Sequence, residues 1–279
     1  MADTGLSVPS ASPDALSMHV ERARDQTTPQ PGVFWLNGLR SSMRGEKAEA
    51  LARWCVDNCH DCIRFDYRGH GVSPGRFEDC TIGDWLADAR AVFAAHARGP
   101  QIVVGSSMGG WLAALLAEEF RADPPEKAWI AGLILIAPAI DMTERLMWQA
   151  MPEPVRAQLL GTGVFNRPSH YGDGDYPITR ALIEEGRDHL FGDRPFDPGC
   201  PVHIIHGARD PDVPLRVSED FCANLACADV RLTVIPDGEH RLSRPQDIAV
   251  LLSAVATMAA QVSASPDALS ASSPSRQVG

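Results

Sequence analysis

Six short, largely apolar runs rich in β-branched residues recur along the chain. They are Val33–Leu36, Cys62–Phe65, Ile102–Val104, Ile130–Ile136, Val202–Ile205 and Val230–Ile235. Runs of this length suit strands that are covered on both faces. Stretches with helical spacing lie between most of them: Gly45–Val56, Ile82–Ala97, Met108–Phe120, Val217–Leu225 and Pro245–Ala260. The alternation predicts an α/β fold with a mostly parallel central sheet flanked by helices.

The segment from Ala139 to Pro201 interrupts this alternation. It is too long for a simple connection, and it contains helix-like pieces at Met142–Ala150 and Ile178–His189 among Pro, Gly and Asp residues. Long insertions at the C-terminal edge of a parallel sheet commonly form lids. The sequence therefore predicts a helical cap insertion at about residues 140–199, within one domain of residues 18–261.

Both ends of the chain are rich in Ser, Ala and Pro and poor in large apolar residues. Such segments cannot offset ordering entropy by burial, so we expect disordered tails at residues 1–17 and 262–279. The octapeptide SASPDALS occurs at residues 10–17 and again at 263–270. The repeat is either a short docking motif or a product of slippage or recombination, and the low complexity of the tails favours the second explanation.

The charge balance and the termini exclude several classes of protein. The chain has 25 Lys and Arg against 36 Asp and Glu, a net charge of −11. An acidic surface repels phosphate backbones and anionic lipid heads, so no nucleic acid or membrane partner is expected. No apolar run approaches the roughly 18 residues that span a bilayer. The N-terminus shows neither a signal peptide nor an Arg-rich transit sequence, and the seven cysteines form no disulfide pattern, so a cytoplasmic location is predicted.

A candidate nucleophile lies between a predicted strand and a predicted helix. Residues 105–109, Gly-Ser-Ser-Met-Gly, match the G-x-S-x-G pattern in the strand–turn–helix context that it requires. A nucleophile on so sharp a turn needs glycine two residues to either side, because side chains there would collide. Ser107 meets this condition and Ser106 does not. The helix that follows presents free N–H groups that favour a developing oxyanion.

A serine hydroxyl needs a general base that is itself oriented by a carboxylate. In this chain order the acid precedes the histidine. Asp210 and Asp212 follow the fifth predicted strand, and His240 follows the sixth. Asp210 is the first choice for the acid and Asp212 the second, although each also suits a solvated turn. The order Ser107, Asp210, His240, with each residue just past a strand, predicts a catalytic triad at the C-terminal edge of the sheet.

An oxyanion hole needs two N–H donors. Met108, directly after the nucleophile, is expected to supply one, and Leu39, in the glycine-containing loop after the first predicted strand, the other. Three apolar residues of the cap are candidates for substrate binding: Trp148, Met147 and Phe165. Packing between cap helices explains these three equally well.

The sequence predicts neither a metal site nor a cofactor. Cys55, Cys59 and Cys62 have the spacing of an iron–sulfur motif. Cluster ligands need one exposed loop, whereas these three cysteines fall in a predicted helix, a turn and the start of a strand. Small buried thiols are the better interpretation.

These motifs resemble the serine-hydrolase branch of the α/β-hydrolase superfamily, and within it the palmitoyl-protein thioesterases. The resemblance spans about Val33 to Ala260. It rests on residues 45–48 (GEKA), 62–67 (CIRFDY), 105–111 (GSSMGGW), 200–201 (CP) before HG-x-x-D, and 237–241 (DGEHR). It implies ester or thioester hydrolysis and carries the triad onto Ser107, Asp210 and His240. Asn37 departs from the pattern, since many relatives have histidine before the oxyanion glycine.

The main hypothesis is a metal-independent serine esterase or thioesterase that acts on a small acyl substrate through an acyl-enzyme. The same triad also fits acyl transfer, lactone opening or C–C bond cleavage. An alternative of another class is a non-catalytic hydrolase scaffold that binds a ligand. The sequence leaves the acyl chain length, the leaving group and the oligomeric state open.

Overall fold

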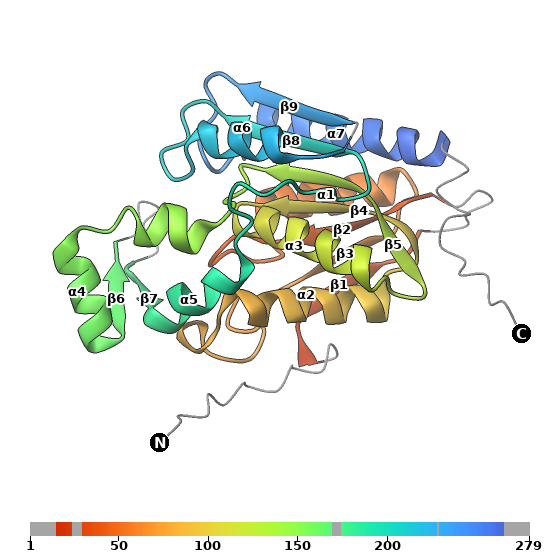
Figure 1. Ribbon diagram of the computed structural model, residues 1–279. Coiled ribbons are helices and arrows are strands. Elements are labelled where there is room, and N and C mark those ends of the chain that lie inside the picture. Colours follow the sequence, from red (N-terminus) through yellow and green to blue (C-terminus); the bar gives the residue numbers. More distant parts are fainter. Residues whose placement is uncertain (1–14, 24–29, 169–173, 228, 265–279) are drawn as a thin grey trace, which may run out of the picture.

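A seven-stranded sheet forms the centre of the protein (Figure 1). The computed structural model describes residues 15–23, 30–168, 174–227 and 229–264. The sheet has the order β1-β3-β2-β4-β5-β8-β9, in which β1 runs antiparallel to β3 and the other neighbours are parallel. Its strands are β1 (Met18–Glu21), β2 (Gly32–Leu36), β3 (Cys62–Phe65), β4 (Gly99–Ser106), β5 (Ala128–Ile136), β8 (Val202–Gly207) and β9 (Val230–Ile235).

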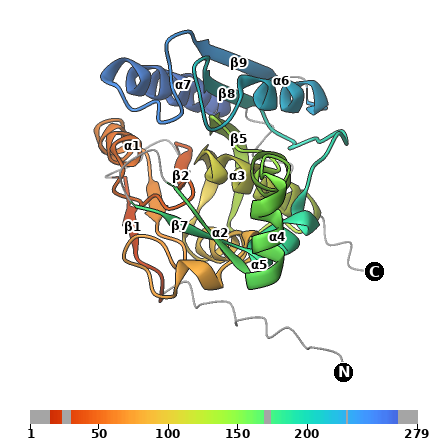
Figure 2. The ribbon, with the colours of Figure 1, turned by 90° about the vertical axis from the view of Figure 1, so that its left-hand side faces the viewer.

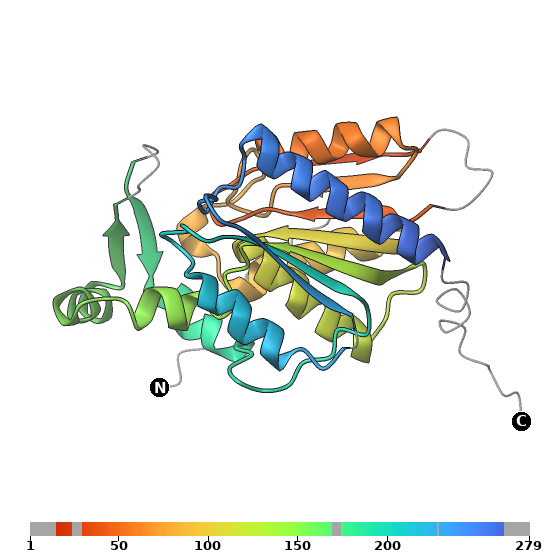
Figure 3. The ribbon, with the colours of Figure 1, turned by 90° about the horizontal axis from the view of Figure 1, so that it is seen from above.

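Helices cover both faces of this sheet. They are α1 (Glu46–Asp57), α2 (Ile82–His96), α3 (Met108–Ala122), α6 (Leu215–Asn224) and α7 (Pro245–Ala264). The blue α7 and the orange α1 lie side by side (Figures 2 and 3) and share one hydrophobic cluster with the sheet. The helices α2, α3 and α6 belong to the cluster on the other face. The α/β fold predicted from the sequence is confirmed.

Alternate residues of β2 show why the strands read as continuous apolar runs. Val33 and Trp35 are buried in the cluster with α1 and α7. Phe34 and Leu36 are buried in the cluster with α2 and α3. Because successive side chains of a strand point to opposite faces, a strand covered on both sides needs apolar residues throughout.

The predicted ends of the ordered domain are off by a few residues. Leu16, assigned to the tail, is 4% exposed and packs in the core. The helix α7 continues through Ala264, beyond the predicted boundary at residue 261. The edge strand β1 was not predicted, because Met18–Glu21 includes His19 and Glu21 and is only half-buried. Most of both SASPDALS copies lies outside the described residues.

The cap projects beyond the C-terminal edge of the sheet (Figure 1). It contains a π-helix η3 (Thr143–Trp148), α4 (Glu153–Thr162), β6 (Val164–Arg167), β7 (Tyr176–Thr179), α5 (Arg180–Glu185) and the 3₁₀ helix η4 (Gly186–His189). The antiparallel pair β6–β7 was not expected in a helical cap. Left-handed Gly163 ends α4 and starts β6, and strands of four residues are too short to leave a clear periodic signal.

Two buried or half-buried acids fix the cap in place: Asp141 joins the two ends of the cap to each other, and Glu185 attaches the cap to the domain. Asp141 accepts hydrogen bonds from the N–H groups of Phe191 and Gly192, at 2.7 and 2.9 Å. Glu185 accepts the N–H of Gly83 at the start of α2, at 3.0 Å. These contacts hold the cap over the edge of the sheet where β4, β8 and β9 end.

One helix in the described part of the chain, α7, is long and apolar enough to cross a membrane by composition. It packs on the sheet through Leu251, Val255 and Met258, which are all buried. A core helix of a globular domain passes the same test of length and composition, so this finding does not establish a membrane span.

Candidate active site

Ser107 occupies a strained turn between β4 and α3. Its φ of 56° lies in the left-handed region, which non-glycine residues rarely adopt. A Cβ on Gly105 would lie 2.2 Å from the carbonyl oxygen of Gly109, and a Cβ on Gly109 would lie 2.2 Å from that of Leu36. The two glycines of the motif are therefore required by the close approach of β4, α3 and β2. The turn is held by the Ser107 N–H, which donates to the carbonyl of Ile136 at 2.8 Å.

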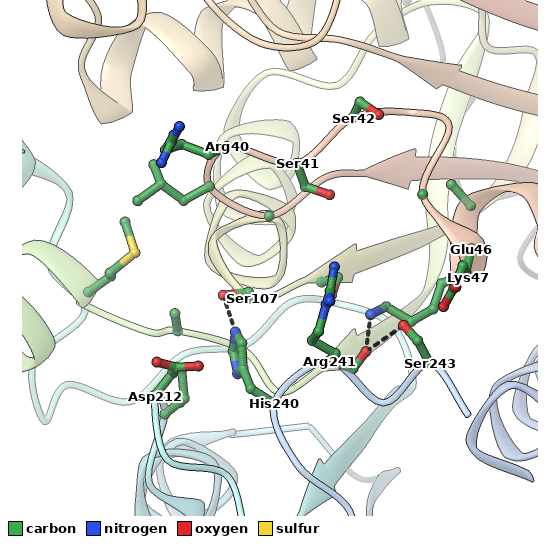
Figure 4. Close-up of a pocket in the computed structure, with 18 of the residues that line it drawn as sticks. Arg40, Ser41, Ser42, Glu46, Lys47, Ser107, Asp212, His240, Arg241 and Ser243 are labelled. Atoms are coloured by element: carbon green, nitrogen blue, oxygen red, sulfur yellow. Dashed lines mark hydrogen bonds between the residues drawn. The ribbon is translucent and has the colours of Figure 1, made fainter. Parts of the chain in front are cut away.

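The structure brings Ser107, His240 and Asp210 together. His240 Nε2 lies 3.0 Å from Ser107 Oγ (Figure 4), and His240 Nδ1 lies 2.7 Å from Asp210 Oδ2. An ionised carboxylate only accepts hydrogen bonds, so Nδ1 carries a proton and Nε2 is left to accept the serine hydroxyl. This tautomer is the one that a general base requires.

Asp210, and not Asp212, holds the imidazole. The Asp210 side chain is fully buried, and its Oδ1 accepts the backbone N–H groups of Asp212 and Val213 at 2.9 and 2.8 Å. Burial disfavours its charge, but hydrogen bonds from His206 and His240 outweigh burial and hold the pKa of Asp210 below its ordinary value. The site thus contains an ionised acid hydrogen-bonded to His240.

Sequence reasoning missed the contribution of His206. This side chain is fully buried, with Nε2 2.9 Å from the carbonyl oxygen of Val213 and 3.4 Å from Asp210 Oδ2. Its Nδ1 lies 2.7 Å from Ser218 Oγ. Since both neighbours of Nε2 only accept, Nε2 donates and Nδ1 accepts the hydroxyl of Ser218. The spacing of His206 four residues before Asp210 is the signal that could have indicated this contact.

Close backbone contact brings the acid loop and the histidine loop together. The Arg209 N–H donates to the carbonyl oxygen of Gly238 at 2.9 Å, and a Cβ on Gly207 would lie 2.4 Å from the same oxygen. Arg244 pairs with both Asp237 and Asp247, at 2.7 and 2.8 Å, and so ties the histidine loop to the start of α7.

The two expected oxyanion donors lie beside the nucleophile. In the described part of the chain, neither the Met108 N–H nor the Leu39 N–H donates a hydrogen bond to the protein. A Cβ on Gly38 would lie 3.3 Å from Ser107 Cβ, so this loop passes close to the nucleophile. Asn37 supports the loop from beneath, since it donates to the Phe65 carbonyl at 2.6 Å and accepts from Trp35 Nε1 at 2.5 Å.

A cavity of about 430 Å³ opens over Ser107. The cap contributes an apolar wall made of Met142, Leu146 and Met147. Of the three residues nominated for substrate binding, Met147 lines this cavity, whereas Trp148 and Phe165 do not.

Both corrections have a packing reason. The Trp148 ring lies between the guanidinium groups of Arg156 and Arg187, 5.2 and 5.3 Å from its centroid. Phe165, on the short strand β6, is half-buried against the main core cluster. Cation–π stacking and hydrophobic packing therefore account for these two aromatic residues.

The site also brings together three groups that metals favour. Ligand atoms of Asp210, Asp212 and His240 lie within 4.8 Å of one another. However, His240 Nδ1 is hydrogen-bonded to Asp210, so two of the three possible metal ligands are already paired with each other.

Of the cysteines that share a cluster-like spacing, Cys55 and Cys62 are buried and Cys59 is exposed. A hydrogen bond to Cys62, together with burial, raises the pKa of the Cys55 thiol.

Comparisons with known proteins agree with this fold. The chain matches the Alpha/beta hydrolase family over residues 31–251. It is 32% identical over 243 residues to the Bos taurus "Palmitoyl-protein thioesterase ABHD10, mitochondrial", which covers 86% of this chain and 76% of that protein. A putative hydrolase from Agrobacterium vitis S4 superimposes with a TM-score of 0.80 at 38% identity, covering 88% of this chain and 99% of that one. Alpha/beta hydrolase domain-containing protein 10 from mouse gives 0.78 at 31% identity, covering 89% and 96%.

These relatives contradict the prediction of a cytoplasmic location. The bovine, orangutan, human, mouse and rat thioesterases that match this chain are all named as mitochondrial proteins. The prediction rested on an N-terminus without a signal or transit pattern and on cysteines without a disulfide pattern. Reduced cysteines do not distinguish one reducing compartment from another.

Proposed function

Because the chain belongs to the alpha/beta hydrolase family, we propose that it is a serine hydrolase that cleaves carboxylic ester or thioester bonds of small acyl substrates through an acyl-enzyme. The observation that carries the proposal is the hydrogen-bonded series from Ser107 Oγ through His240 to the buried Asp210. The similarity to thioesterases supports an acyl ester or thioester as the substrate class.

Acylation begins when Ser107 Oγ attacks the acyl carbon and His240 Nε2 takes its proton. The ionised Asp210 stabilises the imidazolium that forms. The N–H groups of Met108 and Leu39 bind the oxyanion of the tetrahedral intermediate. His240 then donates its proton to the departing alcohol or thiol, which leaves the acyl group on Ser107.

Deacylation repeats these steps with water. His240 removes a proton from a water molecule that attacks the acyl-enzyme, and then returns a proton to Ser107 as the acid product leaves. The apolar wall of Met142, Leu146 and Met147 suits the hydrocarbon part of the acyl group. Each step uses protein groups and water alone.

The test is Ser107→Ala, assayed with p-nitrophenyl esters and acyl thioesters and by fluorophosphonate labelling. We expect kcat to fall by roughly 10⁴-fold or more, because the acyl-enzyme cannot form. Ser106→Ala is the matched control and keeps the covalent label. Near-wild-type turnover by Ser107→Ala would refute the acyl-enzyme, and failure of the wild-type protein to label would favour a non-catalytic scaffold. Products formed with a competing alcohol present distinguish hydrolysis from acyl transfer.

A further inference from the structure

The cavity over Ser107 has the opposite charge to the protein as a whole. The chain carries a net charge of −11. Among the described residues, the cations that line the cavity are Arg40, Arg44, Lys47, Arg167 and Arg241, and the carboxylates are Glu46 and Asp212. A concentration of positive charge in the substrate cavity of an acidic protein indicates an anionic ligand.

Three of these cations gather in one arm of the cavity. We call it the basic arm. It consists of Ser41, Ser42, Arg44, Glu46, Lys47, Arg241 and Ser243, so its three cations outnumber its one carboxylate. Figure 4 shows Lys47, Arg241 and Ser243 on one side of Ser107, while the pale green ribbon of the cap approaches from the opposite side. The cavity therefore has an apolar side that suits an acyl group and, opposite it, a basic side.

Two cations of the basic arm, Arg44 and Lys47, are not explained by salt bridges within the described part of the fold. Most described arginines outside the cavity have a carboxylate partner, such as Arg68 with Asp88 at 2.6 Å. Neither Arg44 nor Lys47 forms a salt bridge with a described residue, although the carboxylates of Glu46 and Asp247 lie near enough to Lys47 to affect its pKa. Lys47 Nζ instead donates to the carbonyl oxygen of Arg241 (Figure 4), which holds two like charges from distant parts of the chain together. Burial and the charge of Arg241 lower the pKa of Lys47 to about 8.

The arm also provides neutral donors. The twelve-residue helix α1 begins at its edge, and its N-cap Gly45 supplies no side-chain cap. The N-terminal N–H groups of a helix carry partial positive charge and suit an anion. The hydroxyls of Ser41, Ser42 and Ser243 add further donors at the same place.

From this arrangement we infer that the basic arm is a subsite for a phosphate group carried by the alcohol or thiol part of the acyl substrate. The inference rests on the proposed function: if Ser107 attacks the acyl carbon and the apolar wall holds the acyl chain, the basic arm is left for the leaving group. A phosphate has two negative charges and several acceptor oxygens, which match several cations, hydroxyls and a helix N-terminus. One bidentate arginine would satisfy a carboxylate.

The size of the cavity limits the leaving group. A volume of about 430 Å³ lies near the lower end for ligand sites. A leaving group in which the scissile bond and the phosphate belong to one short unit, such as a phosphorylated small alcohol, fits a cavity of this size.

The experiment compares three octanoyl esters that share the acyl group and the ester bond: those of glycerol, glyceric acid and glycerol 3-phosphate. We expect kcat/KM for the phosphate ester to exceed that for the neutral ester by about tenfold or more, since each charge-assisted contact is worth roughly one factor of ten. Lys47→Gln and Arg241→Gln should bring this ratio toward one. Lys127→Gln, at an exposed lysine outside the cavity, should leave the ratio unchanged.

The outcomes separate the inference from the proposed function. Equal rates for the neutral and phosphate esters, with turnover that depends on Ser107, would overturn the phosphate subsite and leave the hydrolase intact. A preference for the carboxylate ester would overturn the choice of phosphate. Absence of Ser107-dependent turnover on all three would refute the hydrolase.

Two binding measurements test the subsite without relying on turnover. They apply if none of the three esters is hydrolysed. In calorimetry, glycerol 3-phosphate should bind the wild-type protein and bind Lys47→Gln at least about tenfold more weakly, and no binding to the wild type would overturn the subsite. Rising salt should reduce binding of the phosphate probe by the wild-type protein, because ionic screening weakens contacts between charges. Salt-independent binding would count against it.

Discussion

Proton placement on two histidines decides the chemistry at the scale of single residues. Asp210 lies between His240 and His206. His240 donates to it from Nδ1, and His206 Nε2, which donates to the Val213 carbonyl, lies 3.4 Å from the same carboxylate oxygen. His240 is left with a free acceptor that faces Ser107. His206 uses its remaining nitrogen on the buried Ser218. The same residue type thus serves as a candidate base in one place and as a support for the acid in the other.

Replacing the two neighbouring acids separates their roles. Asp210→Asn should lower kcat by roughly 10³–10⁴-fold, because an amide can no longer hold the Nδ1–H tautomer of His240. Asp212→Asn should cost less than about tenfold, since the Asp212 backbone N–H, which the substitution keeps, makes the contact with Asp210. Steady-state kinetics on one ester measures both variants. A larger loss in Asp212→Asn would reverse the assignment of the acid.

The lowered pKa of Asp210 also predicts how stability depends on pH. A carboxyl group with a folded-state pKa below its unfolded value of about 3.9 stabilises the fold fully above that value. Its contribution is lost as pH falls through the lower folded-state pKa. The difference in unfolding free energy between the wild type and Asp210→Asn should therefore persist from pH 7 to about 5 and shrink below about pH 4. Denaturant unfolding measures it, and a difference that disappears near pH 6 would contradict the expectation.

At the scale of elements, close contact between β2, β4 and α3 shapes the nucleophile turn. The contact passes through Gly105 and Gly109, where a methyl group would meet backbone carbonyl oxygens. Backbone atoms cannot move aside as the end of a flexible side chain can. The conformation of the turn therefore depends on the packing of β2, β4 and α3. These elements maintain the strained backbone at Ser107.

Gly109→Ala should destabilise the protein by about 2–4 kcal/mol and abolish most activity, since β2 and α3 must separate. Gly161→Ala is the matched control. This glycine lies in α4 with nothing near its added methyl group, so the substitution should stabilise the protein by about 0.5–1 kcal/mol. Thermal and urea unfolding give both values. Similar stability of the two variants would show that the turn relaxes freely.

The distribution of charge is the main feature at the scale of the whole molecule. The acidic surface repels a phosphorylated substrate at long range, whereas the basic arm attracts it at short range. Lys47 is central to this balance. It faces Glu46 on its own helix, Arg241 in the histidine loop and Asp247 on α7.

The preference for a phosphate ester should decline between pH 7 and pH 9, because Lys47 loses its proton near pH 8. The ratio of kcat/KM for the phosphate ester to that for the neutral ester reports this ionisation in the free enzyme. In Lys47→Arg the charge is permanent, so the ratio should stay constant over the same range. A decline of equal size in both proteins would assign the effect to another group.

The local patterns of the chain were sufficient to predict six of the seven strands of the central sheet, the helices between them and the turn around Ser107. Apolar runs indicate burial on both faces of a strand. The glycine at 105 reflects a contact with Gly109 within the motif, whereas the glycine at 109 reflects a contact with Leu36 on β2. The order of Ser107, Asp210 and His240 could be proposed because parallel strands present their C-terminal ends at one edge.

Tertiary structure alone decided which side chains meet. It placed β8 beside β9, which puts Asp210 against His240, and it buried His206 beneath the acid. It directed Met147 into the cavity and Trp148 away from it. It also joined Lys47 to Arg241, 194 positions apart in the chain. Periodicity and motif spacing record only what neighbouring residues require, whereas these contacts depend on sheet order and side-chain packing between segments far apart in sequence.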